Sequence, residues 1–169
     1  MAQILERLRA QVLAMAELHR ALALHPGQDI PLSDHLRRVA GSAALTSPGR
    51  VLLHQELADD CAVRPEAVLP LGQIVSEAMT NALKHAKPRS AMVQIAVRCW
   101  RDDLNRVCVE VADNGPGLAP DAASSNSLGL RLIRQLARKA GGAAEFVSTK
   151  TGLRVLVRIP RHPPSGAWS

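Results

Sequence analysis

Polar side chains that could bind a ligand recur every four residues in the stretch SEAMTNALKHA, residues 76–86. Glu77, Asn81 and His85 stand four apart, and Lys84 adds a positive charge next to the last of them. Side chains four apart share one face of a helix, and these lie on the border between an apolar and a polar half. An unpaired buried polar group costs about 1–3 kcal/mol. Glu77, Asn81 and His85, called the polar ladder below, therefore form either a solvated helix face or one side of a ligand site.

A second motif, VADNGPGL at residues 111–118, places an aspartate at the end of an apolar strand and follows it with a glycine turn. The Asp113 carboxylate only accepts hydrogen bonds, so it can receive an exocyclic amine such as the N6 group of adenine. Gly115 and Gly117 let the backbone approach a ligand closely and adopt positive φ. A plain β-turn is the alternative, because Asn-Gly-Pro-Gly also suits one.

A third motif, SLGLRLIRQLARKAGG at residues 127–142, opens an amphipathic helix with a glycine. The free N–H groups and the dipole of a helix N-terminus favour phosphate. Arg131 and Arg134 oppose that dipole near the start of the helix, which favours an anion there. A helix that only caps and packs is the alternative reading.

Hydrophobic periodicity predicts the elements that must position these motifs. The predicted helices cover residues 2–24, Ser33 (as N-cap) to Leu45, Pro65 or Glu66 to the residues before Pro88, and Leu128–Ala140. The predicted strands cover residues 50–57, 91–100, 106–113, 143–150 and 153–160. Antiparallel hairpins next to helices favour an α+β two-layer sandwich over a doubly wound sheet.

Composition and charge narrow the choice of function. The 169 residues suit one globular domain with a modest extra element. The chain has a net charge of +6, and its positive excess lies in the half from Lys84 onward, where fourteen Lys and Arg stand against six Asp and Glu. Such an excess favours an anionic partner. Three aromatic residues are too few for a base-stacking platform, so nucleic acid is not expected. Three cysteines without metal or redox spacing, a charged N-terminus and no membrane-length apolar run predict a cytoplasmic protein.

In this order, SEAMTNALKHA, DNGPGL and SLGLRL resemble the N box and the two glycine boxes of the GHKL ATPase superfamily, which includes histidine kinases, gyrase, Hsp90 and MutL. The pattern is especially similar to histidine kinase catalytic domains. Residues 7–22 are similar to the second dimerisation helix of those kinases, and residues 30–43 to the segment that follows it. The resemblance implies a Bergerat-type ATP-binding fold over residues 47–160 and a dimerisation-region remnant over residues 1–46. The terminal segment RHPPSGAWS, residues 161–169, is expected to be a disordered tail.

The resemblance also implies roles for individual residues. Asn81 would bind Mg²⁺ and phosphate, Glu77 would act in catalysis near the γ-phosphate, and Asp113 would receive adenine N6. Residues 118–127 would form a short lid. The further positions implied to bind ATP are Lys84, His85, Gly115, Gly117, Leu118, Ser127, Gly129, Leu130 and Thr151.

Two features depart from the family pattern. The last box usually reads Gly-Thr and here reads Gly152-Leu153, so a hydroxyl near the adenine is missing unless Thr151 replaces it. No phosphoacceptor histidine is evident. His19 imitates the start of such a motif but lies 58 residues before Glu77, which suits the second dimerisation helix, and helix packing or capping is its alternative role.

These features predict the ATP-binding domain of a two-component sensor histidine kinase. As a histidine protein kinase in a phosphorelay, it would use Mg-ATP to phosphorylate a histidine supplied elsewhere. The expected partners are a response regulator and a second copy bound through the N-terminal helices. One alternative is a non-catalytic phosphotransfer or scaffold protein with the same fold, favoured by the lost threonine and the absent phosphoacceptor. Another is a stand-alone GHKL serine kinase of the anti-sigma factor type.

Overall fold

The computed structural model describes residues 28–85, 92–118 and 128–160, together with seven helical residues near the N-terminus, Arg9, Val12, Met15, Ala16, His19, Arg20 and Ala23. Most of the predicted first helix, the predicted lid (residues 118–127) from residue 119 onward and the tail over residues 161–169 lie outside the described residues. In chain order the elements are β1 (Ile30–Pro31), α2 (Ser33–Leu45), β2 (Val51–Leu57), β3 (Ala62–Val63), α3 (Pro65–His85), β4 (Val93–Arg101), β5 (Val107–Asp113), α5 (Leu128–Lys139), β6 (Ala143–Thr149) and β7 (Gly152–Ile159).

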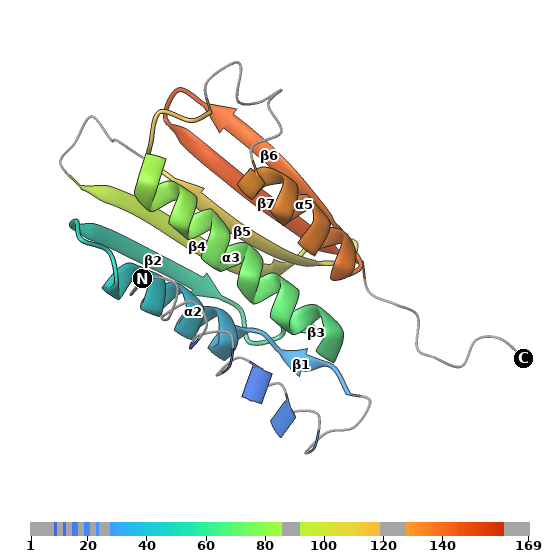
Figure 1. Ribbon diagram of the computed structural model, residues 1–169. Coiled ribbons are helices and arrows are strands. Elements are labelled where there is room, and N and C mark those ends of the chain that lie inside the picture. The colour runs from blue at the N-terminus through green and yellow to red at the C-terminus, as the bar shows by residue number, and fades with distance from the viewer. Residues whose placement is uncertain are drawn as a thin grey trace, which may run out of the picture.

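Five strands form one mixed sheet in the order β2-β4-β5-β7-β6, and α2, α3 and α5 lie along one of its faces (Figure 1). Neighbouring strands are antiparallel except β2 and β4, which run parallel. Parallel neighbours need a crossover of about a dozen residues or more, and the 21-residue helix α3 lies within that connection. The predicted α+β two-layer sandwich is confirmed.

The core lies between α3 and the sheet. The apolar half of α3, predicted from its periodicity, is buried and includes Ile74 and Met79. It belongs to one buried cluster with Val97 of β4 and Val109 of β5. Side chains along a strand alternate between the two faces of a sheet. On β4 and β5, every second side chain, in step with Val97 and Val109, therefore faces the helices. This packing holds α3 across the sheet and directs its half-buried border toward α5.

The helix α2 packs into the same cluster through Leu32, Leu36 and Ala40. The prediction of Ser33 as its N-cap is wrong: Leu32 occupies the cap position, and no side chain caps the helix. The Leu32 N–H donates to Cys61 O at 2.8 Å and the Leu32 carbonyl accepts the Leu36 N–H at 2.9 Å, so the residue just before β3 anchors the start of the helix.

Strands β1 and β3 pair with each other as a separate two-stranded sheet that the sequence pattern did not predict. Two residues are too few to show an alternation of apolar and polar side chains. The division of the chain after residue 46 remains a prediction. In the described part of the chain, none of the helices combines the length and the apolar character that crossing a bilayer requires.

Candidate nucleotide-binding site

Asp113 ends β5 on the face of the sheet that the helices cover, since it alternates in step with the core residues Val109 and Val111. Its Oδ1 accepts hydrogen bonds from the backbone N–H groups of Gly115 (2.8 Å) and Leu153 (3.3 Å). Among the described residues, Oδ2 has no hydrogen-bond partner. One oxygen is therefore held by the protein, and the other can accept a hydrogen bond from a ligand amine.

Asn114 ties the start of the glycine loop to β4. Its backbone N–H donates to Gln94 O at 3.2 Å, its Oδ1 accepts the Gln94 N–H at 2.8 Å, and its Nδ2 donates to Met92 O at 3.3 Å. These bonds extend the β4–β5 pairing one residue beyond Asp113. An asparagine side chain can imitate the backbone in this way. The sequence pattern indicated only a turn role for this residue.

The far end of the glycine loop lies against the turn that joins β6 to β7. Gly117 has a φ of 75°, and a Cβ added to it would overlap Thr149 O and lie 2.7 Å from Ser148 Oγ. A Cβ on Gly152 would overlap Asp113 O. The Leu118 N–H donates to Ser148 Oγ at 2.7 Å. The loop and the turn are therefore in contact at both ends, and glycine is required where the two backbones meet.

A second group of predicted site residues gathers where α5 begins. A Cβ on Gly129 would lie 2.9 Å from both Glu77 Oε1 and Asn81 Nδ2, so the first turn of α5 is packed directly on the polar ladder of α3. Glu77 and Asn81 are half-buried, as a border position predicts. The side chain of Leu130 is buried, and the contact of its backbone N–H with phosphate stays a prediction.

The end of α3, the start of α5, the end of β5 and the β6–β7 turn lie at the same end of the helix-covered face (Figure 1). Lys84 and His85 are exposed on the last turn of α3, beyond Asn81. Ser127 lies outside the described residues. A carboxylate acceptor, a half-buried amide and a helix N-terminus at one edge are the groups that an amine-bearing base, a magnesium ion and phosphates require.

Thr151 is exposed in the β6–β7 turn, where its hydroxyl lies 3.1 Å from Thr149 Oγ1. The Leu153 backbone N–H, at the start of β7 just after this turn, donates one of the two hydrogen bonds that Asp113 Oδ1 accepts. Neither Leu153 nor Ser148 was predicted as a site residue. Both act across 30 or more residues, and no local pattern in the sequence reports such contacts.

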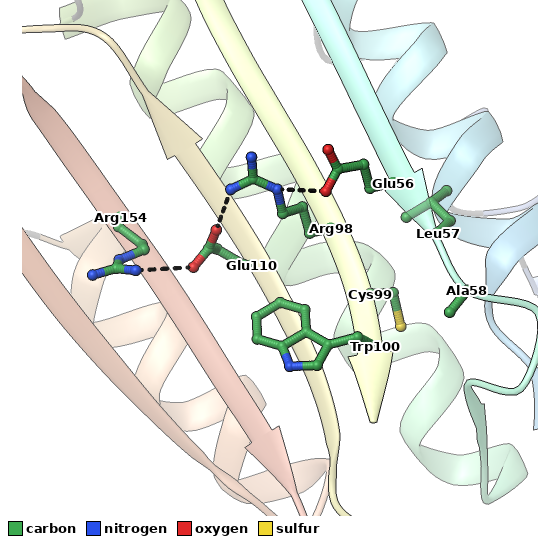
Figure 2. A pocket seen from close by; sticks show the side chains of 8 residues that line it. All are labelled: Glu56, Leu57, Ala58, Arg98, Cys99, Trp100, Glu110 and Arg154. Carbon is green, nitrogen blue, oxygen red and sulfur yellow. Dashed lines mark hydrogen bonds and ion pairs between the residues drawn. The ribbon is translucent and has the colours of Figure 1, made fainter. Parts of the chain in front are cut away.

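A cavity of about 590 Å³ opens on the opposite face of the sheet, away from the predicted site (Figure 2). Arg98 there bonds Glu56 at 2.9 Å and Glu110 at 3.1 Å, and Arg154 lies 3.5 Å from Glu110. The hydrogen bonds to Glu110 and Glu56 raise the pKa of Arg98. None of the predicted ATP-binding residues lines this cavity.

Comparison with known proteins agrees with this geometry. The family described as histidine kinase-, DNA gyrase B- and HSP90-like ATPase matches residues 66–163. The blue-light-activated histidine kinase 2 of Erythrobacter litoralis is 35% identical over 136 residues, which are 78% of this chain and 38% of that kinase. The sensor histidine kinase LiaS of Bacillus subtilis is 30% identical over 94 residues, 55% of this chain and 25% of that kinase. The chain therefore spans well under half the length of these relatives.

Solved structures show the same likeness. The histidine kinase domain of the Erythrobacter litoralis EL346 blue-light-activated kinase superposes with a TM-score of 0.76 at 27% identity, covering 94% of this chain and 81% of that domain. The ATP-binding domain of PrrB from Mycobacterium tuberculosis gives a TM-score of 0.57 at 28% identity, covering 80% of this chain and 97% of that domain. The resemblance read from the three motifs is confirmed, and the chain belongs to the histidine kinase-, DNA gyrase B- and HSP90-like ATPase family, with an ATP-binding domain of the histidine kinase type.

Proposed function

We propose that this chain binds Mg-ATP as the catalytic domain of a sensor histidine kinase and presents the γ-phosphate to a histidine supplied elsewhere. The main support for the proposal is that the two carboxylate oxygens of Asp113 have different surroundings. Two backbone N–H groups hold Oδ1, and Oδ2 is left as an acceptor. An adenine N6 amine can donate to that oxygen, whereas the carbonyl oxygen at the same position of guanine cannot.

The residues at the junction of α3 and α5 suit the phosphates. Asn81 would hold Mg²⁺ through its amide oxygen, a hard ligand, and Glu77 would orient the reacting group beside the γ-phosphate. Lys84 and His85, with Ser127 and the N–H groups of Gly129 and Leu130, would contact phosphate oxygens. When bound, Mg²⁺ would supply positive charge beside the phosphates. Phosphoryl transfer depends mainly on positioning and charge, so this set needs no covalent nucleophile.

The same proposal extends to partners and location. A response regulator would receive the phosphoryl group in a two-component phosphorelay, and a second copy would bind through the N-terminal helices. On the described part of the first helix, Val12 and Met15 are 65% and 59% exposed, as an unpaired dimerisation face would be. We place the chain in the cytoplasm, where ATP is available and where the three free cysteines would stay reduced.

Isothermal titration calorimetry with Mg-ATP tests the proposal, comparing the unmodified chain with Asp113→Asn. The asparagine keeps an oxygen for the Gly115 and Leu153 N–H groups but turns an NH₂ toward the ligand amine. A hydrogen bond to a charged group contributes about 1.5–3 kcal/mol, so ATP affinity should fall at least about tenfold. Asp103→Asn, in the exposed β4–β5 loop, is the matched control and should bind ATP normally.

If the unmodified chain binds no nucleotide, the kinase proposal fails and a scaffold with the same fold is the better reading. If it binds ATP, γ-labelled ATP with a kinase partner that carries the phosphoacceptor helix tests transfer in trans. Label that survives alkali on the partner's histidine supports the kinase. Label on a serine instead would assign the chain to the serine kinases.

A further inference from the structure

The turn between β6 and β7 lines the outer side of the glycine loop. Gly152 lies against the Asp113 carbonyl, the Leu153 N–H bonds Asp113 Oδ1, and Gly117 lies against the Thr149 carbonyl. The Leu118 N–H donates to Ser148 Oγ at 2.7 Å. The glycine loop therefore contacts this turn at both of its ends, at Asp113, the carboxylate proposed to bind adenine, and at Leu118, where the predicted lid begins.

The turn is held by its own hydrogen bonds. Thr149 Oγ1 donates to Gly152 O at 3.3 Å and accepts the Thr151 N–H at 3.2 Å. The hydroxyl groups of Thr149 and Thr151 lie 3.1 Å apart. The β6–β7 pairing continues to Thr149 opposite Gly152. The turn is thus held by groups of its own, and the position of Ser148 beside the loop is set by the β6–β7 pairing.

Ser148 holds the part of the loop that lacks other support. Asn114 and Gly115 are fixed by bonds to β4 and to Asp113. Among the described residues, no backbone–backbone hydrogen bond outside the strands and helices involves residues 116–118. Ser148 Oγ accepts from Leu118 and also lies 2.7 Å from the place where a Cβ of Gly117 would stand. The Ser148 hydroxyl therefore accepts the N–H of the Gly117–Leu118 peptide and lies beside Gly117.

We propose that Ser148 is a positioning residue of the nucleotide site, which holds Gly117 and Leu118 in the conformation that receives the base. This inference rests on the proposed ATP function. The hydroxyl touches the loop and does not itself bind the nucleotide. Without it, the loop must be ordered when ATP binds, and that ordering weakens affinity.

The expected effect is moderate and local. A neutral hydrogen bond of this kind is typically worth about a fivefold change in an equilibrium constant. Ser148→Ala should therefore weaken Mg-ATP binding about three- to tenfold. Because Ser148 is exposed on its strand, the core should be unaffected and the thermal midpoint nearly unchanged. Ser148→Thr keeps the acceptor oxygen and should restore affinity to within about twofold, since threonine also suits a strand.

Calorimetry with Mg-ATP on the full chain tests this, together with amide hydrogen exchange in the absence of nucleotide. In Ser148→Ala, the Leu118 amide should exchange faster while the amides of β5 and β7 keep their protection. Ser148→Thr should restore both readouts. Thr46→Ala, which removes a hydroxyl bonded to the Ser42 carbonyl at the end of α2, is the control and should change neither.

The outcomes separate the two proposals. If the unmodified chain binds no nucleotide, the ATP function fails and this inference fails with it. If the unmodified chain binds ATP and Ser148→Ala binds it equally well, Ser148 is not a positioning residue and the ATP function stands. Weakened binding that Ser148→Thr does not restore would also overturn the inference, because the acceptor oxygen would not be the cause.

Discussion

The Asp113 carboxylate uses its two oxygens differently. Oδ1 accepts two backbone N–H groups, and Oδ2 is the oxygen proposed to accept the ligand amine. The residue type and its place at a strand end are visible in the sequence. The second N–H comes from Leu153, the position where the family pattern has a threonine. Because a backbone group makes this contact, the leucine side chain does not remove it. The departure in the last box therefore leaves the carboxylate held in place.

Gly129 allows a close approach between the start of α5 and two side chains of α3. A Cβ there would lie 2.9 Å from Glu77 Oε1 and from Asn81 Nδ2. Both are ends of flexible side chains, so Gly129→Ala should fold but displace the two groups proposed for the phosphate end. We expect Mg-ATP affinity to fall roughly tenfold, the loss of about one charge-assisted hydrogen bond, with no drop in thermal midpoint. Calorimetry and thermal unfolding measure the two effects.

Gly41→Ala is the matched control for that change. Gly41 also lies in a helix, and a Cβ there would meet no atom within 4 Å. Alanine in a helix interior is favoured over glycine by about 1 kcal/mol. This variant should be slightly more stable and should bind ATP as the unmodified chain does. Equal ATP affinity in both variants would show that Gly129 is not needed for close approach.

Among the elements, the sheet carries different chemistry on its two faces. One face packs against α3, and the other aligns charges across neighbouring strands. The register pairs Glu56 of β2 with Arg98 of β4, and Arg98 with Glu110 of β5. Figure 2 shows these side chains pointing toward one another across the strands. Glu110 is only 5% exposed, and its carboxylate forms ion pairs with Arg98 and Arg154.

Arg98→Leu should destabilise the sheet by about 1–3 kcal/mol, because it removes a partner from a buried carboxylate. The value is below the full cost of an unpaired buried charge, since Arg154 remains and Arg98 is itself 40% exposed. Urea unfolding measures the change. ATP affinity should stay unchanged, because the network lies on the face opposite the nucleotide site.

Glu56→Gln is the control for the network, since Glu56 is more than half exposed and exposed ion pairs contribute little. Its unfolding midpoint should hardly move. The double variant Arg98→Leu with Glu110→Leu should recover part of the lost stability, because no buried charge is then left unpaired. If Arg98→Leu is as stable as the unmodified chain, the buried carboxylate does not depend on this arginine.

For the whole molecule, the proposed assembly can be tested through the first helix. Val12 and Met15 are apolar and exposed there. We expect the unmodified chain to be a dimer by light scattering with size-exclusion chromatography, and Val12→Glu with Met15→Glu to be a monomer, because charges would have to be buried in the contact. Leu104→Glu, at a 71% exposed position in the β4–β5 loop, should remain a dimer. A monomeric unmodified chain at high concentration would contradict the proposal.

The sequence by itself determined the motifs and the elements that carry them. The positions of Asn81, Asp113 and Gly129 follow from short patterns, and α3 and α5 follow from periodicity, because these are local properties of the chain. The bounds of α5 and β5 agree with the prediction to within one residue. The same local reading placed Ser33 at the N-cap, where the contact between Leu32 and Cys61 moved the start of the helix.

Only the tertiary structure decided which groups meet. The bonds from Leu118 to Ser148 and from Leu153 to Asp113 span 30 and 40 residues, and the burial of Glu110 depends on neighbouring strands. Such contacts are set by the strand order and by packing, which act between distant segments. The sequence therefore specifies the side chains that could hold a nucleotide, and the fold specifies the backbone and hydroxyl groups that hold those side chains and the loop in place.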